Sequence, residues 1–208
     1  MLKFACMKLT CDELLMKYFE MQPPHPYEVR RLCRMLFCEL SQNVFEMPRR
    51  ESDYLEVAAV LHDVGYAVED ATKSHNKLSR DIILEEGLKG FSDEEVKIIA
   101  CIARYHRGSL PDKNEHKLYG SFSKTERNII KRLAGILRFA DGLDGEHKPL
   151  IKEIKIENDR ENNIIKINLY KKEDVKGLDI TKSLRKRDLL EIGFKCQSVV
   201  FIKSEPKI

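Results

Sequence analysis

Hydrophobic residues recur at helical spacing through the first 148 residues of the chain. Three of these apolar series follow a capping box, in which a hydroxyl caps the helix and a glutamate three residues later binds back to the cap. The capping hydroxyls belong to Thr10, Ser92 and Ser123. The spacing predicts further helices that begin near Pro26, contain residues 55–61, and run over 73–86 with Gly87 as the stop.

The pattern changes near Pro149, where alternation replaces helical spacing. Residues 165–169 alternate between apolar and polar side chains, as in a strand with one buried face. Residues 151–156 fit a strand more loosely, and the polar segment 158–163 predicts a hairpin loop between the two strands.

A helix and a final strand complete the predicted C-terminal part. The helix covers residues 182–191 with Gly193 past its end, and the strand covers 198–202. We therefore predict a mainly α-helical protein, with a helical domain over residues 1–148 and a small C-terminal α+β subdomain over 149–208.

The composition excludes several classes of protein. Of 208 residues, 42% are hydrophobic and 34% are charged, which excludes an intrinsically disordered chain. No run of about 18 apolar residues predicts a membrane helix, and no secretory signal is readable at Met1. The six cysteines form no C-x-x-C pair, so we expect reduced thiols and no cysteine-based zinc site. We expect a cytoplasmic protein without a membrane partner.

The charge distribution gives weak evidence about partners. The formal net charge is +3, and the basic excess lies in residues 151–208. The run 182–188 is interpreted as a solvated helix face. Because no basic strand is rich in aromatic residues that could stack bases, we do not expect a nucleic-acid partner. An anionic partner and a homodimer stay open.

Histidines and one aspartate stand where apolar helix faces end. His62, His106 and Asp141 each lie four and seven residues after apolar residues, and His25 lies four and seven residues before two others. Because this spacing keeps residues on one helix face, we expect these side chains to point toward the core. A buried carboxylate is costly unless it is paired or binds a metal. Imidazole with carboxylate suits Mn, Fe, Co, Ni or Zn, so we predict a divalent transition-metal cofactor of one or two ions.

An ordered set of segments resembles a known family. The series His25, His62-Asp63, Asp141 resembles the H…HD…D signature of the HD-domain metal-dependent phosphohydrolases. The likeness is closer to the C-terminal HD-like region of the exopolyphosphatase/guanosine pentaphosphatase (Ppx/GppA) family. The main segments that carry it are AAVLHDVGY at 58–66, RYHR at 104–107, LRFADGLD at 137–144 and KRDLLEIGF at 186–194. The resemblance covers nearly the whole chain and implies an HD-type helical bundle.

The resemblance also implies a ligand set and a reaction. His25, His62, Asp63 and Asp141 would bind one metal, and His75 and His106 would add a second that shares Asp63. Asp63 would be the catalytic residue, holding the metal and orienting the water that attacks phosphorus. The implied partner is a phosphorylated small-molecule substrate, either an ester or an anhydride, of the nucleotide, guanosine tetra/pentaphosphate or polyphosphate class.

Phosphoryl transfer requires cations on the phosphate oxygens. The candidates from the sequence are Arg107, Lys77, Arg104 and Arg138, with Arg107 preferred because it follows a proposed ligand directly.

Other interpretations stay open. The exopolyphosphatases of that family cleave phosphate in actin-like domains with a Gly-rich loop, and no such loop occurs here. The chain could therefore be a regulatory module that binds a phosphorylated ligand or an exopolyphosphatase-like partner. His147 is expected to be structural, with a place in the site as the alternative, and His116 is expected on the surface. Asp144 could cap a helix, pair with an arginine or support the site.

Overall fold

Helices dominate the fold, and one small sheet completes it. The computed structural model describes residues 8–21, 23–68 and 74–203. The helices are α1 (Cys11–Tyr18), α2 (Pro24–Asn43), α3 (Arg49–Leu61), the 3-10 helix η1 (Val64–Ala67), α4 (His75–Glu86), α5 (Asp93–Arg104), α6 (Lys117–Ser121), α7 (Lys124–Leu143), α8 (Thr181–Arg185) and α9 (Asp188–Phe194). The strands are β1 (Ile151–Asp159), β2 (Ile164–Lys171) and β3 (Gln197–Lys203). The prediction of a mainly α-helical protein with a small sheet is confirmed.

The three predicted capping boxes are present. At the starts of α1, α5 and α7, the hydroxyls of Thr10, Ser92 and Ser123 accept the backbone N–H three residues later. The glutamate at that position accepts the N–H of the cap in return. Each box satisfies two backbone donors that a helix start otherwise leaves unpaired. Local chemistry therefore fixes where these three helices begin.

Two details of the predicted C-terminal part are wrong. The helix expected over 182–191 is split into α8 and α9, with a break at Lys186 and Arg187. Gly193 lies inside α9, and Lys195 ends that helix in the left-handed conformation at φ 55°. A Cβ on Gly193 would lie 2.8 Å from Cα of Arg132, so the glycine allows close packing against α7 and does not stop the helix.

Other boundaries differ by smaller amounts. Helix α2 begins at Pro24, two residues before the expected start near Pro26, and α4 begins at His75. Its expected start at Lys73 lies outside the described residues. The short elements η1 and α6 were not predicted.

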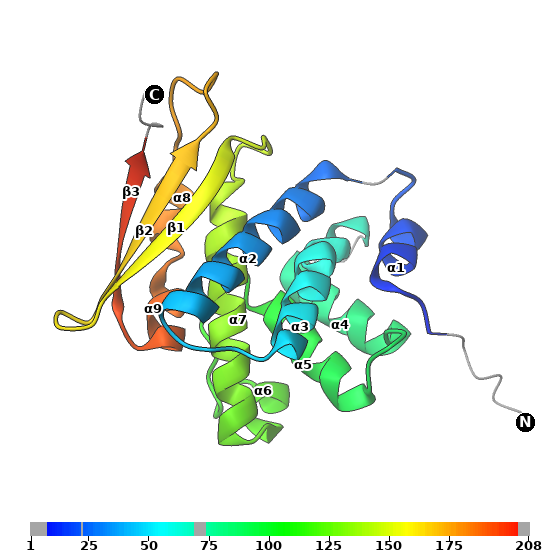
Figure 1. Cartoon of the computed structure of the whole chain (residues 1–208). Helices are drawn as coiled ribbons and strands as arrows, with labels where there is room; N and C mark the ends of the chain where they lie inside the picture. Colours follow the sequence, from blue (N-terminus) through cyan, green and yellow to red (C-terminus); the bar gives the residue numbers. More distant parts are fainter. Residues whose placement is uncertain (1–7, 22, 69–73, 204–208) are drawn as a thin grey trace, which may run out of the picture.

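The sheet has the order β1-β2-β3. Strands β1 and β2 pair antiparallel through the predicted hairpin, with an irregular register between Ile151 and Glu153. Strand β3 pairs parallel to β2, and α8 and α9 form the connection between them. Figure 1 shows the sheet at one side of the molecule, with α2 and α7 between it and the helices α3, α4 and α5.

Helix α7 is the axis of the fold (Figure 1). It packs against α2, α3, α5, α8 and α9. The buried side chains of the helices and of the sheet form one hydrophobic cluster, which includes Leu137 of α7, Ile167 of β2 and Leu189 of α9. The core is therefore continuous past residue 148, and the division into two domains there stays a prediction.

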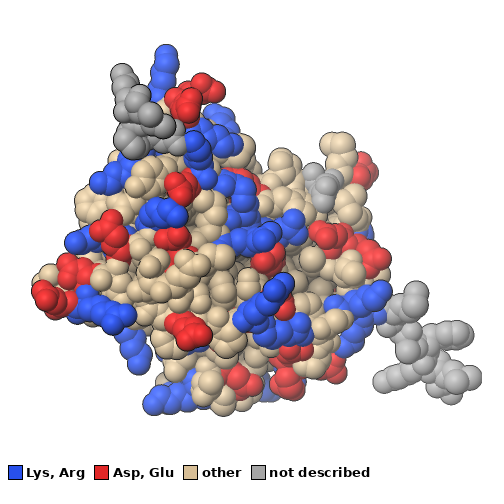
Figure 2. Space-filling model, in the orientation of Figure 1, with Lys and Arg blue, Asp and Glu red and all other residues tan. Residues whose placement is uncertain are grey.

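Surface charge is mixed on the face shown in Figure 2, where basic and acidic side chains are interspersed. In the described part of the chain, no helix combines the length and apolar character needed to cross a bilayer.

Glycines on one face of α7 let α8 and α9 approach its backbone. A Cβ on Gly135 would lie 2.7 Å from the carbonyl oxygen of Leu189, and one on Gly142 would lie 2.5 Å from Cα of Ser183. The two glycines are seven residues apart and share a helix face. Ser183 is buried there and donates its hydroxyl to the carbonyl of Phe139 at 2.9 Å.

Gly135→Ala tests this contact. In an exposed helix the change would stabilise by about 1 kcal/mol through helix propensity. Overpacking against the backbone of α9 costs about 1–3 kcal/mol, so we expect a net decrease in the free energy of unfolding, measured by urea denaturation. The matched control is Gly177→Ala, where a Cβ meets nothing within 4 Å. Equal stability of the two variants would contradict the close contact.

Candidate metal centre

All six predicted ligands converge at the ends of helices. His25 lies in the first turn of α2, and His62 and Asp63 follow the last turn of α3. His75 is the first residue of α4, and His106 follows the end of α5. Asp141 lies in the last turn of α7. Five of these residues line one pocket of about 540 Å³, and the sixth, His62, is fully buried beside them.

The carboxylate of Asp63 lies between two pairs of imidazoles. Its Oδ1 is 3.3 Å from Nε2 of His75 and 3.5 Å from Nε2 of His106. Its Oδ2 is 3.3 Å from Nε2 of His62 and 3.8 Å from Nε2 of His25. Two groups of possible metal ligands therefore share Asp63, namely His25 with His62 and His75 with His106.

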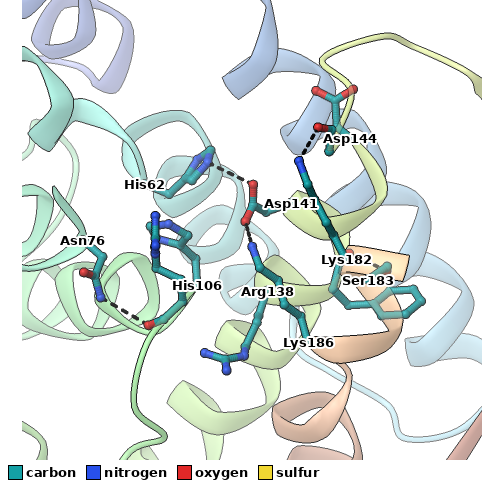
Figure 3. A network of polar contacts seen from close by, with 12 residues as sticks. His62, Asn76, His106, Arg138, Asp141, Asp144, Lys182, Ser183 and Lys186 are labelled. Atoms are coloured by element: carbon teal, nitrogen blue, oxygen red, sulfur yellow. Dashed lines mark hydrogen bonds and ion pairs between the residues drawn. The ribbon is translucent and has the colours of Figure 1, made fainter. Parts of the chain in front are cut away.

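Asp141 completes the first of these groups. Its Oδ1 lies 3.3 Å from Nε2 of His25 and 3.8 Å from Nε2 of His62. Its other oxygen, Oδ2, accepts a hydrogen bond from the ammonium group of Lys186. Figure 3 shows this carboxylate between the imidazole of His62 and the side chain of Lys186. Asp141 can thus offer one oxygen to a cation while the other stays paired.

Hydrogen bonds at the far ring nitrogens orient the imidazoles. Nδ1 of His62 lies 2.8 Å from the carbonyl oxygen of Ala59, and Nδ1 of His106 lies 2.8 Å from that of Ala103. A carbonyl only accepts, so each Nδ1 donates and Nε2 faces the centre. Nε2 of His62 is buried without a hydrogen-bond partner in the structure. A buried nitrogen without a partner, surrounded by imidazole and carboxylate, fits a metal of the Mn, Fe, Co, Ni or Zn type.

Asp144 supports the centre from behind His25. Its Oδ2 lies 2.6 Å from Nδ1 of His25, and the carboxylate is 2% exposed. A carboxylate on the far nitrogen of a ligating histidine fixes its ring and raises its basicity. Of the interpretations left open for Asp144, its side chain makes this contact, while its backbone occupies the C-cap of α7. The signal in the sequence is its spacing, three residues after Asp141.

A close approach of backbones places Asp63 beside His75. After α3 the chain turns through η1, where the N–H of Gly65 donates to Oγ of Ser79 at 2.9 Å. A Cβ on Gly65 would lie 2.1 Å from the carbonyl oxygen of His75. Only glycine therefore lets η1 lie against α4, and this contact brings together the two halves of the centre.

The structure separates the four predicted phosphate-binding cations. Arg107 and Arg138 line the pocket of the centre. Arg138 binds Asp188 and the carbonyl of Gly108, while Arg107 is exposed. Lys77 and Arg104 line a different pocket and are not brought to the ligands.

Two lysines that sequence reasoning did not place at the site lie at its pocket. Lys182 and Lys186 line the pocket of the centre. Lys182 donates to the carbonyl of Gly145 at 2.7 Å, and Lys186 pairs with Asp141. The interpretation of residues 182–188 as a solvated face holds for Lys182, which is exposed, and is wrong for Lys186, which is partly buried against Asp141. Packing of α8 on the glycine face of α7 turns them toward the centre.

Two further histidines and one tyrosine lie at the two pockets. His147 stacks on His25, with ring centroids 4.2 Å apart, and Tyr66 stacks on His75 at 3.8 Å; both line the pocket of the centre. His116 lies in the other pocket, half-buried, with its Nδ1 2.9 Å from the hydroxyl of Tyr105. The expectation of a surface position for His116 is therefore correct only in part.

The match to a family model covers most of the chain. Residues 8–191 match the model of Ppx/GppA phosphatase, domain III. The chain belongs to the Ppx/GppA phosphatase family. The search of curated proteins found no match. The matched residues of this family member include all six candidate ligands and Asp144.

Buried charge sets the protonation of the histidines in this Ppx/GppA chain. Burial acts to lower the pKa of His25, but hydrogen bonds with Asp141 and Asp144 outweigh it and raise the pKa to about 9. Burial opposes charge at His62 too, where Asp63 raises the pKa. Burial and the charge on His62 lower the pKa of His106 to about 3. A proton on His25 offsets part of the negative charge of the carboxylates, and a divalent cation would compete with that proton.

The carboxylates themselves are held ionised. Burial acts to raise the pKa of Asp63, but His62 and His75 outweigh it and hold that pKa well below its usual range. The pKa of Asp141 is lowered in the same way, against burial, by His25 and His62 with a further contribution from Lys186. Two permanent negative charges in a largely buried site give a strong preference for cations.

Metal content tests the shared role of Asp63. After reconstitution with Mn, we expect about two equivalents in the natural chain and less than one in Asp63→Ala, because both groups of ligands lose the same carboxylate. Inductively coupled plasma mass spectrometry gives the content. Asp174→Ala, an exposed aspartate, is the matched control. Full loading of Asp63→Ala, or no metal in either protein, would exclude this centre.

Asp144→Asn tests the support of His25. The amide keeps the shape and an acceptor but loses the charge, so we expect metal affinity to fall about 10–100-fold without loss of helical circular dichroism. Competition with a fluorescent chelator measures the affinity. Asp174→Asn should bind like the natural chain, and an unchanged affinity in Asp144→Asn would leave Asp144 with a packing role only.

Proposed function

We propose that the chain is a metal-dependent phosphohydrolase of the HD type, acting on a phosphate ester or anhydride. The observation that supports this most is the position of Asp63, whose two oxygens each face a separate pair of imidazoles. Paired metal sites bridged by one carboxylate suit the displacement of an oxygen from phosphorus. Nucleotides, guanosine tetra/pentaphosphate and short polyphosphate are the substrate classes that we propose.

The protein groups prepare such a site in advance. Divalent ions held there would supply Lewis acidity toward a phosphoryl oxygen and would make water a better nucleophile near neutral pH. His62 and His106 keep Nε2 directed inward through their bonds to backbone carbonyls. The two carboxylate oxygens of Asp63 face different imidazoles. Asp63 would also accept a hydrogen bond from the attacking water.

Cations around the pocket would hold the phosphate. Arg107 lies over its edge, with one guanidinium nitrogen 3.4 Å from the hydroxyl of Tyr66 and 3.5 Å from Nδ1 of His75. Within the described residues it has no carboxylate partner within ion-pair distance. A planar, exposed guanidinium can therefore bind phosphate through two parallel hydrogen bonds. Lys182 and Lys186 lie in the same pocket and add positive charge.

A second candidate function has its own support. The family model that matches this chain describes domain III of the phosphatases, so the matched region is one part of a larger architecture. The chain could bind a phosphorylated ligand, or an exopolyphosphatase-like partner, without turnover. Lys186 favours this candidate, because its ion pair already neutralises part of the charge on Asp141.

Phosphate release distinguishes the two candidates. With Mn-loaded protein, we expect turnover of p-nitrophenyl phosphate, pyrophosphate, short polyphosphate or guanosine tetraphosphate, measured as free phosphate. Asp63→Ala should lose about 100-fold or more in rate, as expected for removal of a group that organises the transition state, while Asp174→Ala keeps full rate. Tight binding of the same compounds without release of phosphate by the natural chain would favour the binding module.

A further inference from the structure

A second pocket lies on the other side of the segment that carries His106. It has a volume of about 720 Å³ and lies between α4, the end of α5 and α6. Side chains close in sequence divide between the two pockets. His75 and His106 face the metal centre, while Lys77 and Arg104 face the second pocket. The amide of Asn76 ties the turn between them by donating to the carbonyl oxygens of Arg104 and Arg107, at 2.8 and 3.2 Å (Figure 3 shows the first).

Arg104 is the unusual residue of this second pocket. It is 6% exposed and lines the cavity. Its guanidinium lies 5.4 Å from the ring centroid of Tyr105. Among the described residues, no side chain or carbonyl accepts a hydrogen bond from that guanidinium, and no carboxylate pairs with it. The guanidinium therefore presents its donors to the cavity that it lines, where an anion can accept them.

The surrounding charges favour an anion as well. Lys77, Arg80 and Lys117 line the same cavity and exceed its two acids in number. One of those acids, Asp81, is bound to Arg80 at 2.6 Å. Burial and then the charge of Arg104 lower the pKa of His116, against the opposite effect of Asp112 and Glu115.

We propose that this pocket is a second anion site, which binds the phosphate group of a small organic phosphate independently of the metal centre. Arg104 presents a planar fork for two phosphate oxygens. Lys77 and Lys117 supply point charges, and the hydroxyl of Ser109 supplies a polar contact. The volume exceeds that of phosphate alone, and Leu84 and Leu118 line it for an organic portion.

The test uses inorganic phosphate as the probe and the full chain in the presence of EDTA. Phosphate is titrated at constant ionic strength, and amide shifts are followed by nuclear magnetic resonance. We expect saturable shifts at Ser109 and Lys117 in both the natural chain and Asp63→Ala. Arg104→Lys keeps the charge but loses the fork, so affinity should fall about tenfold. Lys77→Ala, an exposed change, should weaken binding several-fold.

Lys124→Ala is the matched control, because Lys124 is exposed and lies outside the cavity. It should bind phosphate like the natural chain. Shifts confined to the surroundings of His25 and Asp63, or lost in Asp63→Ala, would assign the phosphate to the metal centre and overturn the proposal. Affinity unchanged in both Arg104→Lys and Lys77→Ala, or an equal response to chloride, would also overturn it. Neither result depends on whether the chain hydrolyses phosphate.

Discussion

Two ionised carboxylates inside a helical core are the constraint on which the rest of this structure depends. Asp63 and Asp141 are mostly buried, and their pKa values are held low. Isolated charges in such a place would be too costly to keep. Imidazoles and Lys186 compensate them, and a divalent cation would do so more completely. The ends of α2, α3, α5 and α7 must therefore meet at one point to supply these partners.

Close contacts between backbones make that meeting possible. Gly65 lets the turn after α3 lie against α4, and Gly135 and Gly142 let α8 and α9 lie against α7. Gly65 touches the backbone of the candidate ligand His75, and none of these glycines contributes a side chain to the centre. Their effect is to fix the distances between elements whose side chains form the centre, which is why the packing of α7 matters for chemistry as well as for stability.

Positive charge is arranged on both sides of one short segment. Within residues 104–109, His106 and Arg107 line the pocket of the metal centre. Arg104 and Ser109 line the second pocket. A chain with a net charge of only +3 and a mixed surface thus concentrates cations in two cavities (Figure 2 shows the mixed face). The match to domain III of the Ppx/GppA phosphatases is consistent with the proposed binding of phosphate groups.

The sequence by itself determined the starts of the three capped helices and the types of candidate ligand, because both depend on neighbours within one or two turns. The caps at Ser92 and Ser123 and the stripe positions of His62 and Asp141 are of this kind. Tertiary structure alone decided which cations face the centre. Lys77 and Arg104 point into another pocket, while Lys182 and Lys186 reach Gly145 and Asp141. Helical spacing places a side chain on a face, but only the packing of α8 on α7 decides what that face meets.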